Sequence, residues 1–347
     1  MTAGEALVSG ATACGVVVLA FGCRARPPEL HVYTWADYIK PAVVARFEER
    51  EHCRVVIDTF DSNEAMYAKL KAGAGGYDVL TPSSYMVQVM NAQGMLRALD
   101  HERLPNLRNV DRAILGRAID PEMHHSAPYM LTITGIAYLK SRVASFRPSW
   151  AMFGRTDLAG RMTMLNDMRE TMGAALKSLG YSLNSTDEGE VARARDVVLG
   201  WKKNLAKLEN EQYKTGLASG EFLLVHGYSG DVLQVQKENP DIAFAVPLEG
   251  ASFACDDLAV PRDAPHAVLA HAFIDFLHEP AVAAENTEFL SYLCPNSASY
   301  ALLGAETRAN PALFPAPDVL ARCEVIRDLG SANALYVRAW DAIKGSR

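Results

Sequence analysis

Hydrophobic and polar positions along this chain switch between a two-residue period and a period of three to four residues. An alternating run at 30–34 predicts a short strand, and the segment near 41–51 places its apolar residues on one helical face behind a proline. A second strand is predicted at Arg54–Phe60 and a third, buried strand at Tyr77–Leu80. Strands that alternate with helices in this way predict a parallel sheet with helices on both faces.

Polar residues indicate where two of the helices in the first third of the chain begin. Asp61 is followed three residues later by Glu64, a capping-box pattern that predicts a helix at Ser62–Ala72. Ser83 and Ser84 follow the third strand and are predicted to cap the helix after it.

The second half of the chain continues the alternation after a polar, loop-like stretch at Asp100–Met123. Pro128–Leu139 is extended and long enough to leave one lobe and enter another. Helices are predicted at Met168–Leu179, Thr186–Leu205, Gln212–Gly220, His266–His278, Pro280–Phe289, Pro317–Cys323 and Asn333–Ile343, and the start of a further helix at Val232–Lys237. Strands are predicted at Phe222–His226, Ile242–Val246 and Asp257–Val260. The pattern therefore predicts a two-lobe α/β protein whose chain crosses between its lobes more than once.

The loop between the first strand and the first helix carries the first candidate chemistry. Trp35, Asp37 and Tyr38 follow the carboxyl end of the strand, which is the edge where open α/β sheets bind ligands. Two aromatic faces and one negative charge are suited to an organic cation. The alternative, which this stretch alone leaves open, is an aromatic pair that packs on the core.

Composition narrows the class of protein. The chain has 347 residues, 49% of them hydrophobic, which is enough to bury a full core in two lobes. The formal net charge of −7 argues against nucleic acid as a partner and permits a cationic one.

The N-terminus has the pattern of an export signal. A short apolar run at Val16–Cys23 is followed by Arg24 and Arg26. Its ending, Leu-Ala-Phe-Gly-Cys, resembles a bacterial lipobox, which predicts lipidation of Cys23. Two features depart from that pattern, because no Lys or Arg precedes the run and Phe21 is large for its position.

Beyond Cys14 and Cys23, four cysteines are widely spaced along the chain, at Cys53, Cys255, Cys294 and Cys323. Without a CxxC pair, a zinc site is not expected. An even number of cysteines in an exported protein allows disulfides, but their pairing cannot be read from the sequence.

Several longer stretches resemble one known family. They are YTWADYIKPAVVARFEEREHCRVVIDTFDSNEAMYAKLKAG, YDVLTPSSYMVQVMNAQGML, PYMLTITGIAY, NDMRE, VHGYSGDVLQ and PLEGASFACDDLAVP. They are similar to bacterial polyamine-binding proteins, the substrate-binding components of ABC importers for spermidine and putrescine. The resemblance covers nearly everything after residue 28.

The resemblance implies a type II-like periplasmic-binding-protein fold with two α/β lobes. Each lobe has a mixed, mainly parallel sheet flanked by helices, and the ligand cleft lies between the lobes. Lobe 1 is expected at 29–133 plus about 256–303, and lobe 2 at about 134–255 plus 304–347. An export signal and tether are expected at 1–28.

The resemblance also implies site residues in the first part of the chain. Trp35 and Tyr38 match aromatic residues of the family cleft, and Asp37 matches a nearby acidic position. Ser83 and Tyr85, in PSSY, match a second contact loop at another strand end.

Acidic and aromatic residues of the second half match the opposite side of the family cleft. Asp167 and Glu170 resemble the acidic pair that receives amines, and Tyr228 stands where an aromatic residue lines the methylenes. Asp231 resembles an aspartate of the putrescine-preferring branch. Asp167 indicates a binding protein of the spermidine type, whereas Tyr228 and Asp231 indicate one of the putrescine type. The resemblance therefore implies that the ligand is a polyamine and leaves the particular polyamine open.

Two further matches come with two departures. Asp256 matches the acidic residue that receives a ligand nitrogen, and Tyr292 matches a tyrosine of the family motif. The aromatic residue usual two positions before that acid is here Ala254, so one wall of the aromatic box is absent. A glutamine of spermidine binders aligns with Ile326, which removes one hydrogen bond.

Elementary chemistry agrees with these matches. A polyamine carries ammonium groups separated by methylenes, so its cleft needs carboxylates at intervals with aromatic faces between them. Buried ammonium groups without partners would be prohibitive. The five acids Asp37, Asp167, Glu170, Asp231 and Asp256 outnumber the amines of one ligand, so some would serve as supporting or hinge contacts.

Other readings of individual motifs are weaker. A serine hydrolase at Ser229 would need Gly-x-Ser-x-Gly, but the fifth position is Asp231. Ferric iron held by cleft tyrosines would need a compact shell, which well-separated acids do not make. His226 at a predicted strand end is expected to be a packed histidine, and His124-His125 a surface turn.

The sequence therefore predicts a receptor and not an enzyme, with no cofactor, no bound metal and no nucleic-acid partner. We expect a monomer in the periplasm or at the outer face of the cytoplasmic membrane, lipid-anchored if Cys23 is modified. Its expected partners are a polyamine and the membrane permease of an ABC importer. Another organic cation or ferric iron is the alternative ligand.

Overall fold

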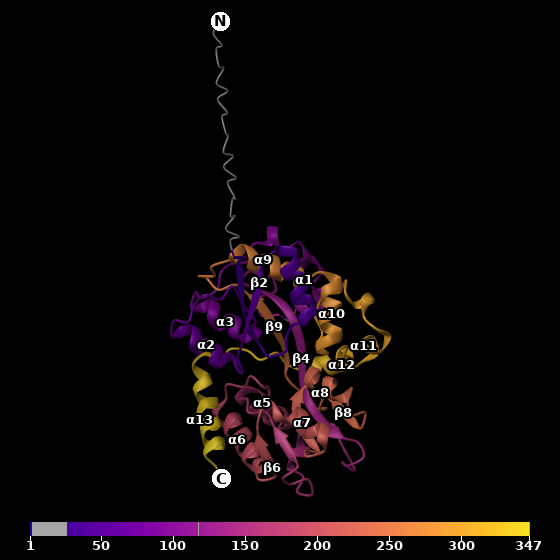
Figure 1. Cartoon of the computed structure of the whole chain (residues 1–347). Helices are drawn as coiled ribbons and strands as arrows, with labels where there is room; N and C mark the ends of the chain where they lie inside the picture. The colour runs from indigo at the N-terminus through magenta and orange to yellow at the C-terminus, as the bar shows by residue number, and fades with distance from the viewer. Residues whose placement is uncertain (2–25, 117, 347) are drawn as a thin grey trace.

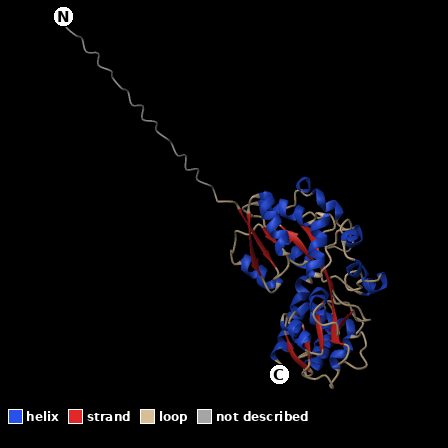
Figure 2. Ribbon diagram, turned by 45° about the vertical axis from the view of Figure 1, so that its right-hand side comes forward, coloured by secondary structure: helices blue, strands red, loops and turns tan. Residues whose placement is uncertain are grey.

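The structure is a computed structural model that describes residues 1, 26–116 and 118–346. The predicted export signal and the predicted lipidation of Cys23 lie outside these residues. The chain forms two lobes, one above the other in Figure 1, and Figure 2 shows strands enclosed by helices in both. The predicted fold class is confirmed, while the lobe boundaries stay a prediction.

The sheet of lobe 1 has the strand order β2-β1-β3-β9-β4. β1 (Glu29–Thr34) is parallel to β2 (Arg54–Thr59) and to the two-residue β3 (Val79–Leu80). β9 (Phe253–Ala259) is antiparallel to both β3 and β4 (Ser126–Leu139). The carboxyl ends of β1 and β3 therefore lie at one edge, as expected for a ligand-binding edge.

The sheet of lobe 2 continues from the second half of β4. β7 (Leu224–Tyr228) and β8 (Ile242–Ala245) pair with β4 in antiparallel fashion. β5 (Met162–Met164) is parallel to β7 and to β6 (Leu205–Leu208). β4 pairs with β9 up to Ile133 and with β7 from Thr134 onward, so this one strand belongs to both sheets.

Helices cover the sheets of both lobes (Figure 1). With lobe 1 lie α1 (Pro41–Glu51), α2 (Asn63–Lys71), α3 (Ser84–Ala92), α4 (Arg112–Leu115), α9 (Ala267–Leu277) and α10 (Pro280–Leu290). With lobe 2 lie α5 (Met168–Ser178), α6 (Glu188–Lys202), α7 (Gln212–Ser219), α8 (Ser229–Gln236) and α13 (Asn333–Gly345). The segment that returns from lobe 1 to α13 contains α11 (Ala305–Ala309) and α12 (Pro317–Arg322). Short 3₁₀ helices occur at His101–Arg103, Pro105–Asn109, Trp150–Gly154, Tyr300–Leu302 and Gly330–Ala332.

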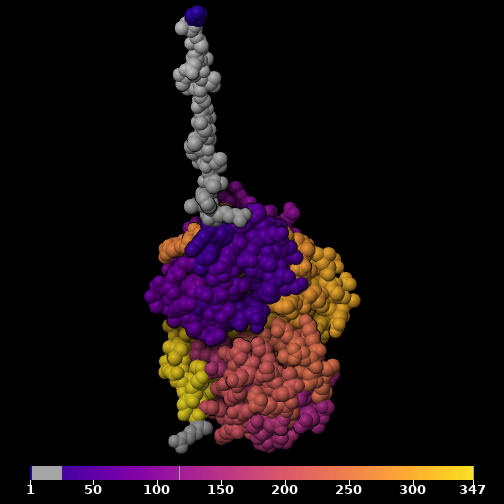
Figure 3. Space-filling model, in the orientation of Figure 1, coloured from indigo at the N-terminus to yellow at the C-terminus, as the bar shows by residue number. Residues whose placement is uncertain are grey.

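The returning C-terminal segment makes a third connection between the lobes, after β4 and β9. It pairs with the strand region at Ser252 through Glu324 and ends in α13, which packs against α5 and α6. The Tyr336 hydroxyl anchors α13 by donating to the carbonyl of Ser185 at 2.8 Å. Figure 3 shows yellow C-terminal residues beside the lower lobe, directly below lobe 1.

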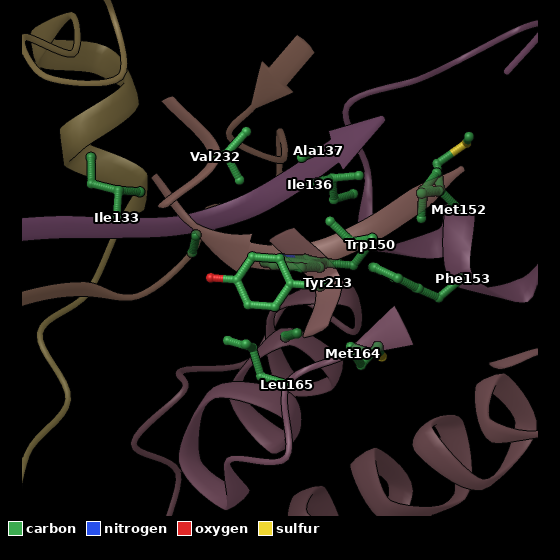
Figure 4. Close-up of a cluster of buried hydrophobic side chains, with 14 of the residues drawn as sticks. Ile133, Ile136, Ala137, Trp150, Met152, Phe153, Met164, Leu165, Tyr213 and Val232 are labelled. Atoms are coloured by element: carbon green, nitrogen blue, oxygen red, sulfur yellow. The ribbon is translucent and has the colours of Figure 1, made fainter. Parts of the chain in front are cut away.

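Each lobe has its own hydrophobic core. In lobe 1 the rings of Phe47 and Phe273 meet edge to face with centroids 4.8 Å apart. In lobe 2 the fully buried Trp150 and Tyr213 lie among aliphatic and methionine side chains (Figure 4). The Trp150 indole donates to the carbonyl of Gly250 at 2.8 Å, which satisfies its polar atom inside the core.

The predicted helix caps are partly wrong. Ser62, not Asp61, is the N-cap of α2, where its hydroxyl accepts from the Ala65 amide at 3.1 Å. Ser83 stands at the N-cap position of α3 but makes no side-chain cap bond, and the Ser84 hydroxyl donates to Asp257 at 3.0 Å. Both serines are turned toward acids of β9, because burying those acids without donors would be unfavourable.

Most other predicted elements are found with ends shifted by a few residues, but β5, β6 and the short helices α4, in the stretch predicted as loop-like, and α11 were not predicted. β5 has three residues and β6 has four, too few to show a clear alternation. Cys53, Cys255, Cys294 and Cys323 are buried and form no disulfide with one another. Across the described residues, no single helix is long and apolar enough to span a bilayer; only α9 and α10 together pass by length and composition, with a 74° bend between them.

Gly135 on β4 gives a test of the shared strand. A Cβ there would lie 2.6 Å from the Phe244 ring and 2.7 Å from the Ala245 carbonyl oxygen. Gly135→Ala should therefore lower the free energy of unfolding by about 1–3 kcal/mol, the usual cost of overpacking. Gly200→Ala in α6, where nothing lies within 4 Å, is the matched control and should be neutral or slightly stabilising. Equal midpoints of thermal unfolding for the two variants would contradict the close packing of β8 on β4.

Candidate functional site

A cavity of about 170 Å³ lies between the two lobes. All eleven residues that the sequence resemblance implied line its wall: Trp35, Asp37, Tyr38, Ser83, Tyr85, Asp167, Glu170, Tyr228, Asp231, Asp256 and Tyr292. They come from both lobes and from segments up to 257 residues apart, and the fold brings every one of them to the same space. Their roles toward a ligand stay a prediction.

The loop after β1 forms one aromatic wall. Asp37 has a φ of 52°, so the chain turns sharply between Trp35 and Tyr38. The Trp35 ring packs on Phe60 with centroids 4.4 Å apart. Tyr38 meets Tyr292 edge to face at 5.7 Å, so the loop is fixed by packing while its side chains reach the cavity.

Asp256 on β9 is the buried acid of the lobe 1 side, with 7% of its surface exposed. The Tyr38 hydroxyl donates to Oδ2 and the Ser83 hydroxyl to Oδ1, each at 2.5 Å. Asn63 in turn holds Ser83, by accepting from its amide and donating to its hydroxyl, both at 3.0 Å. Burial raises the pKa of Asp256 to about 6, although both hydroxyl bonds lower it.

Asp167 and Glu170 form the acidic pair of lobe 2, at the start of α5. Asp167 is the N-cap, and its Oδ1 accepts from the amides of Arg169 at 2.8 Å and Glu170 at 3.0 Å. Glu170 accepts from the hydroxyls of Ser252 at 2.7 Å and Thr134 at 2.9 Å. Burial, with the neighbouring charge of Asp167, raises the pKa of Glu170 to about 7.

Asp231 is held by two phenols in the first turn of α8. The Tyr213 hydroxyl donates to Oδ2 at 2.5 Å and the Tyr292 hydroxyl to Oδ1 at 2.8 Å. Both tyrosine rings lie so close to the backbone that only glycine fits beside them. A Cβ at Gly227 would lie 2.7 Å from the Tyr213 ring, and a Cβ at Gly230 would lie 2.4 Å from the Tyr292 ring. The glycines of the HGYSGD motif thus make room for the two tyrosines that orient its aspartate.

The remaining two predicted residues are tyrosines with different surroundings. The Tyr85 hydroxyl donates to Glu64 at 2.9 Å, within lobe 1. Tyr228 packs against the hydrophobic cores of both lobes. Burial raises the pKa of both phenols well above its usual value, so they act as neutral aromatic groups.

Sequence reasoning missed several residues of the cavity wall, among them Lys214, Glu211, Arg169, Asn210 and Thr132. Lys214 and Glu211 lie three residues apart next to a predicted helix, a spacing that is normal for a solvated surface pair. Nothing in the sequence places that pair in the cleft, because its position depends on how α7 packs against α8. Ser252 and Thr134 were missed for the same reason, since only the fold brings their hydroxyls to Glu170.

Both departures from the family pattern lie at the cavity wall. Ala254 and Ile326 line it, so the small side chain and the missing amide face the space between the lobes. At position 254 the cavity wall therefore carries a methyl group where the family usually has an aromatic ring.

The weaker sequence motifs lie apart from the cavity or lack partners for chemistry. The Ser229 hydroxyl is buried and accepts from the Ile133 amide at 3.3 Å. His226 is fully buried beside Trp150, and burial lowers its pKa to about 3. The backbone amides of His124 and His125 donate to Asp120 in a turn. Among the described residues, no group of three or more His, Cys, Asp or Glu side chains is arranged to hold a metal ion.

The electrostatic character of the cavity follows from its lining. The basic residues of the lining are Arg169 and Lys214. The acidic residues are seven, namely Asp37, Asp61, Asp167, Glu170, Glu211, Asp231 and Asp256. Carboxylates in a partly desolvated space between aromatic rings favour a cation with apolar spacers.

Two α/β lobes joined by crossing strands, with a charged cavity between them, define a binding protein of the periplasmic type. The comparison with known families agrees, since residues 42–316 match the bacterial extracellular solute-binding proteins. The chain belongs to this family.

Individual relatives are similar over almost the whole chain. A spermidine/putrescine-binding periplasmic protein of Salmonella typhimurium is 31% identical over 320 residues, which cover 92% of each chain. A solved structure from Listeria monocytogenes, whose name refers to a spermidine/putrescine ABC transporter, superposes with a TM-score of 0.88 at 30% identity, covering 92% of this chain and 99% of that one. The TpPotD lipoprotein of Treponema pallidum gives a TM-score of 0.83 at 34% identity, covering 91% and 99%.

The donors to Glu170 provide a direct test of this geometry. In Ser252→Ala, the pKa of Glu170 should rise above about 7, because the lost hydroxyl bond stabilises the ionised carboxylate. Carbon-13 NMR titration of the glutamate side chains measures this value. Ser219→Ala, whose hydroxyl donates within α7, is the control and should leave Glu170 unchanged. The same Glu170 pKa in both variants would contradict the assigned hydrogen bond.

Proposed function

We propose that this protein is an extracytoplasmic receptor that captures polyamines and delivers them to the membrane permease of an ABC importer. One observation carries the proposal: two buried carboxylates, Asp256 and Glu170, face the same cavity from the two lobes, and among the described residues neither has a Lys or Arg nitrogen within 4.0 Å. Asp256 stands on one side and Glu170 with Asp167 on the other. Ammonium groups of a ligand would offset the desolvation of these acids, and the acids would do the same for the ligand.

The aromatic residues supply the second half of the recognition. Trp35, Tyr38, Tyr85, Tyr228 and Tyr292 line the same cavity as the acids and would pack on methylene spacers while attracting the flanking charges. Asp37 and Asp231 would add negative potential, and Ser83 would orient Asp256. The names of the relatives, which refer to spermidine and putrescine, support the same ligand class.

Capture would proceed by closure of the lobes around the ligand, a hinge motion of a common type. Neither lobe carries the complete set of acids, so only the closed form pairs both ends of a polyamine. The closed form would then be the shape that the permease recognises.

The proposed location follows from the N-terminal sequence and the relatives. Export to the periplasm, or to the outer face of the cytoplasmic membrane with Cys23 lipidated, fits a receptor that works as a monomer beside its permease. One relative is named a periplasmic protein and another a lipoprotein, which supports both forms.

Ferric iron is the less favoured ligand. A tyrosine-based iron site needs deprotonated phenolates. Here the hydroxyls of Tyr38 and Tyr292 keep their protons and donate hydrogen bonds to Asp256 and Asp231. Burial and these carboxylates raise the pKa of both phenols well above its usual value. Another organic cation is the alternative that the same titrations would reveal.

The decisive experiment is calorimetry of the purified mature protein with putrescine, cadaverine, spermidine and spermine. Saturable binding of at least one of them is expected. No heat from any of the four at millimolar concentration would overturn the proposal, and a tyrosinate absorption band on adding ferric iron would favour the metal instead.

Asp256→Asn should weaken binding by roughly 30-fold or more, since removing one partner of a buried charge pair costs at least about 2 kcal/mol. The matched control is Asp263→Asn, which removes the same charge from an exposed position outside the cavity. Equal affinities of the two variants, measured by the same calorimetry, would remove Asp256 from the site.

Affinity should also depend on pH in a stated direction. The pKa values of Asp256 and Glu170 are about 6 and about 7, and a cation binds their ionised forms. Affinity should therefore be highest near pH 8 and fall as pH drops through 7 and then 6, by up to about tenfold per unit for each proton released. Titrations in buffers of different ionisation enthalpy would detect the released protons, and a flat profile from pH 8 to pH 5 would contradict the pairing.

A further inference from the structure

Lys214 is one of two basic residues that line a cavity proposed to receive cations. It stands on α7, and its Nζ lies 3.0 Å from Glu211 Oε2 and 3.8 Å from Asp231 Oδ2. Burial lowers its pKa, but Asp231, Glu211 and Asp37 together raise it, so the side chain is an ammonium. The protein thus places a positive charge of its own among the acids.

The other basic residue of the cavity wall has a different task. The Arg169 guanidinium donates to the Arg327 carbonyl at 2.8 Å and to Asn184 Oδ1 at 2.9 Å. It also lies over the Tyr336 ring at 5.1 Å. Arg169 is therefore committed to holding the C-terminal segment, and Lys214 is the base that pairs with an acid of the cavity.

Three of the acids that line the cavity, Asp256, Glu170 and Asp231, differ in how their charge is compensated. Asp256 and Glu170 receive hydroxyl donors, and within the described chain neither has a Lys or Arg nitrogen within 4.0 Å. Asp231 receives two phenols and, in addition, Lys214. Two positions are thus left for ligand ammonium groups, one from each lobe, while the third already has its cation.

We propose that Lys214 is a built-in ammonium that occupies the Asp231 position and restricts the ligand to diamines. This rests on the proposed function. The two ends of a diamine such as putrescine or cadaverine pair with Asp256 and with the Asp167–Glu170 pair. A third ammonium, as in spermidine, meets Lys214 near Asp231 and is repelled, because like charges in a partly desolvated cavity interact strongly.

The test compares diamine and triamine affinities in matched variants. Lys214→Met keeps the length of the side chain and removes its charge. Calorimetry with putrescine, cadaverine and spermidine should show spermidine binding strengthened by about tenfold or more, the scale of one like-charge contact at an effective dielectric constant near 20. Binding of the two diamines should change by less than about threefold, the spread common for a supporting position.

Two further variants separate charge from shape. Lys203→Met removes the same charge from an exposed position outside the cavity and should leave all three affinities unchanged. Lys214→Arg keeps the positive charge and should keep the preference for diamines. Thermal unfolding of each variant establishes that the fold is intact.

The outcomes distinguish this inference from the proposed function. If the wild type binds polyamines but the ratio of spermidine to putrescine affinity is the same in Lys214→Met, the role of Lys214 is wrong and the receptor function stands. A wild-type preference for spermidine over both diamines overturns the inference in the same way. If neither the wild type nor Lys214→Met binds any polyamine, the proposed function itself fails.

Discussion

Desolvation of carboxylates is the physical constraint on which the cavity between the lobes depends. A buried charged group loses several kcal/mol of hydration and must be compensated locally. Here the compensation is mostly from hydroxyl groups: Tyr38 and Ser83 at Asp256, Ser252 and Thr134 at Glu170. Hydroxyl donors stabilise the ionised form without cancelling its charge, so the cavity keeps a negative potential that a cation can use.

The same constraint explains why segments far apart in the sequence are fixed relative to one another. Each donor is on a different element: the loop after β1, the loop after β3, β4, and the residue before β9. Thr134 and Ser252 stand where the chain passes between the lobes, since β4 changes its pairing partner between Ile133 and Thr134. Glu170 therefore links the ligand cavity to the strands that connect the two halves.

The sequence was sufficient for the class of fold, for five of the seven acids that line the cavity and for five of its six aromatic residues. Residues such as Trp35, Asp167 and Asp256 occur in extended motifs, and alternation of strands and helices gave the layers. What it did not reveal depends on tertiary neighbours. Lys214 looks like half of a surface pair until α7 is packed against α8, and Ser83 looks like a helix cap until β9 places Asp256 beside it. Short strands such as β5, with three residues, form because they pair with neighbouring strands, and their own residues show too little alternation to predict them.

The three connections between the lobes have a consequence for the ends of the chain. β1 begins at Glu29 in lobe 1, whereas α13 ends at Gly345 in lobe 2. An odd number of passages between two bodies leaves the first strand, β1, and the last helix, α13, on different bodies. The distance between the start of β1 and the end of α13 would therefore change if the lobes open or close, and dyes attached at these two points would measure that motion without touching the cavity.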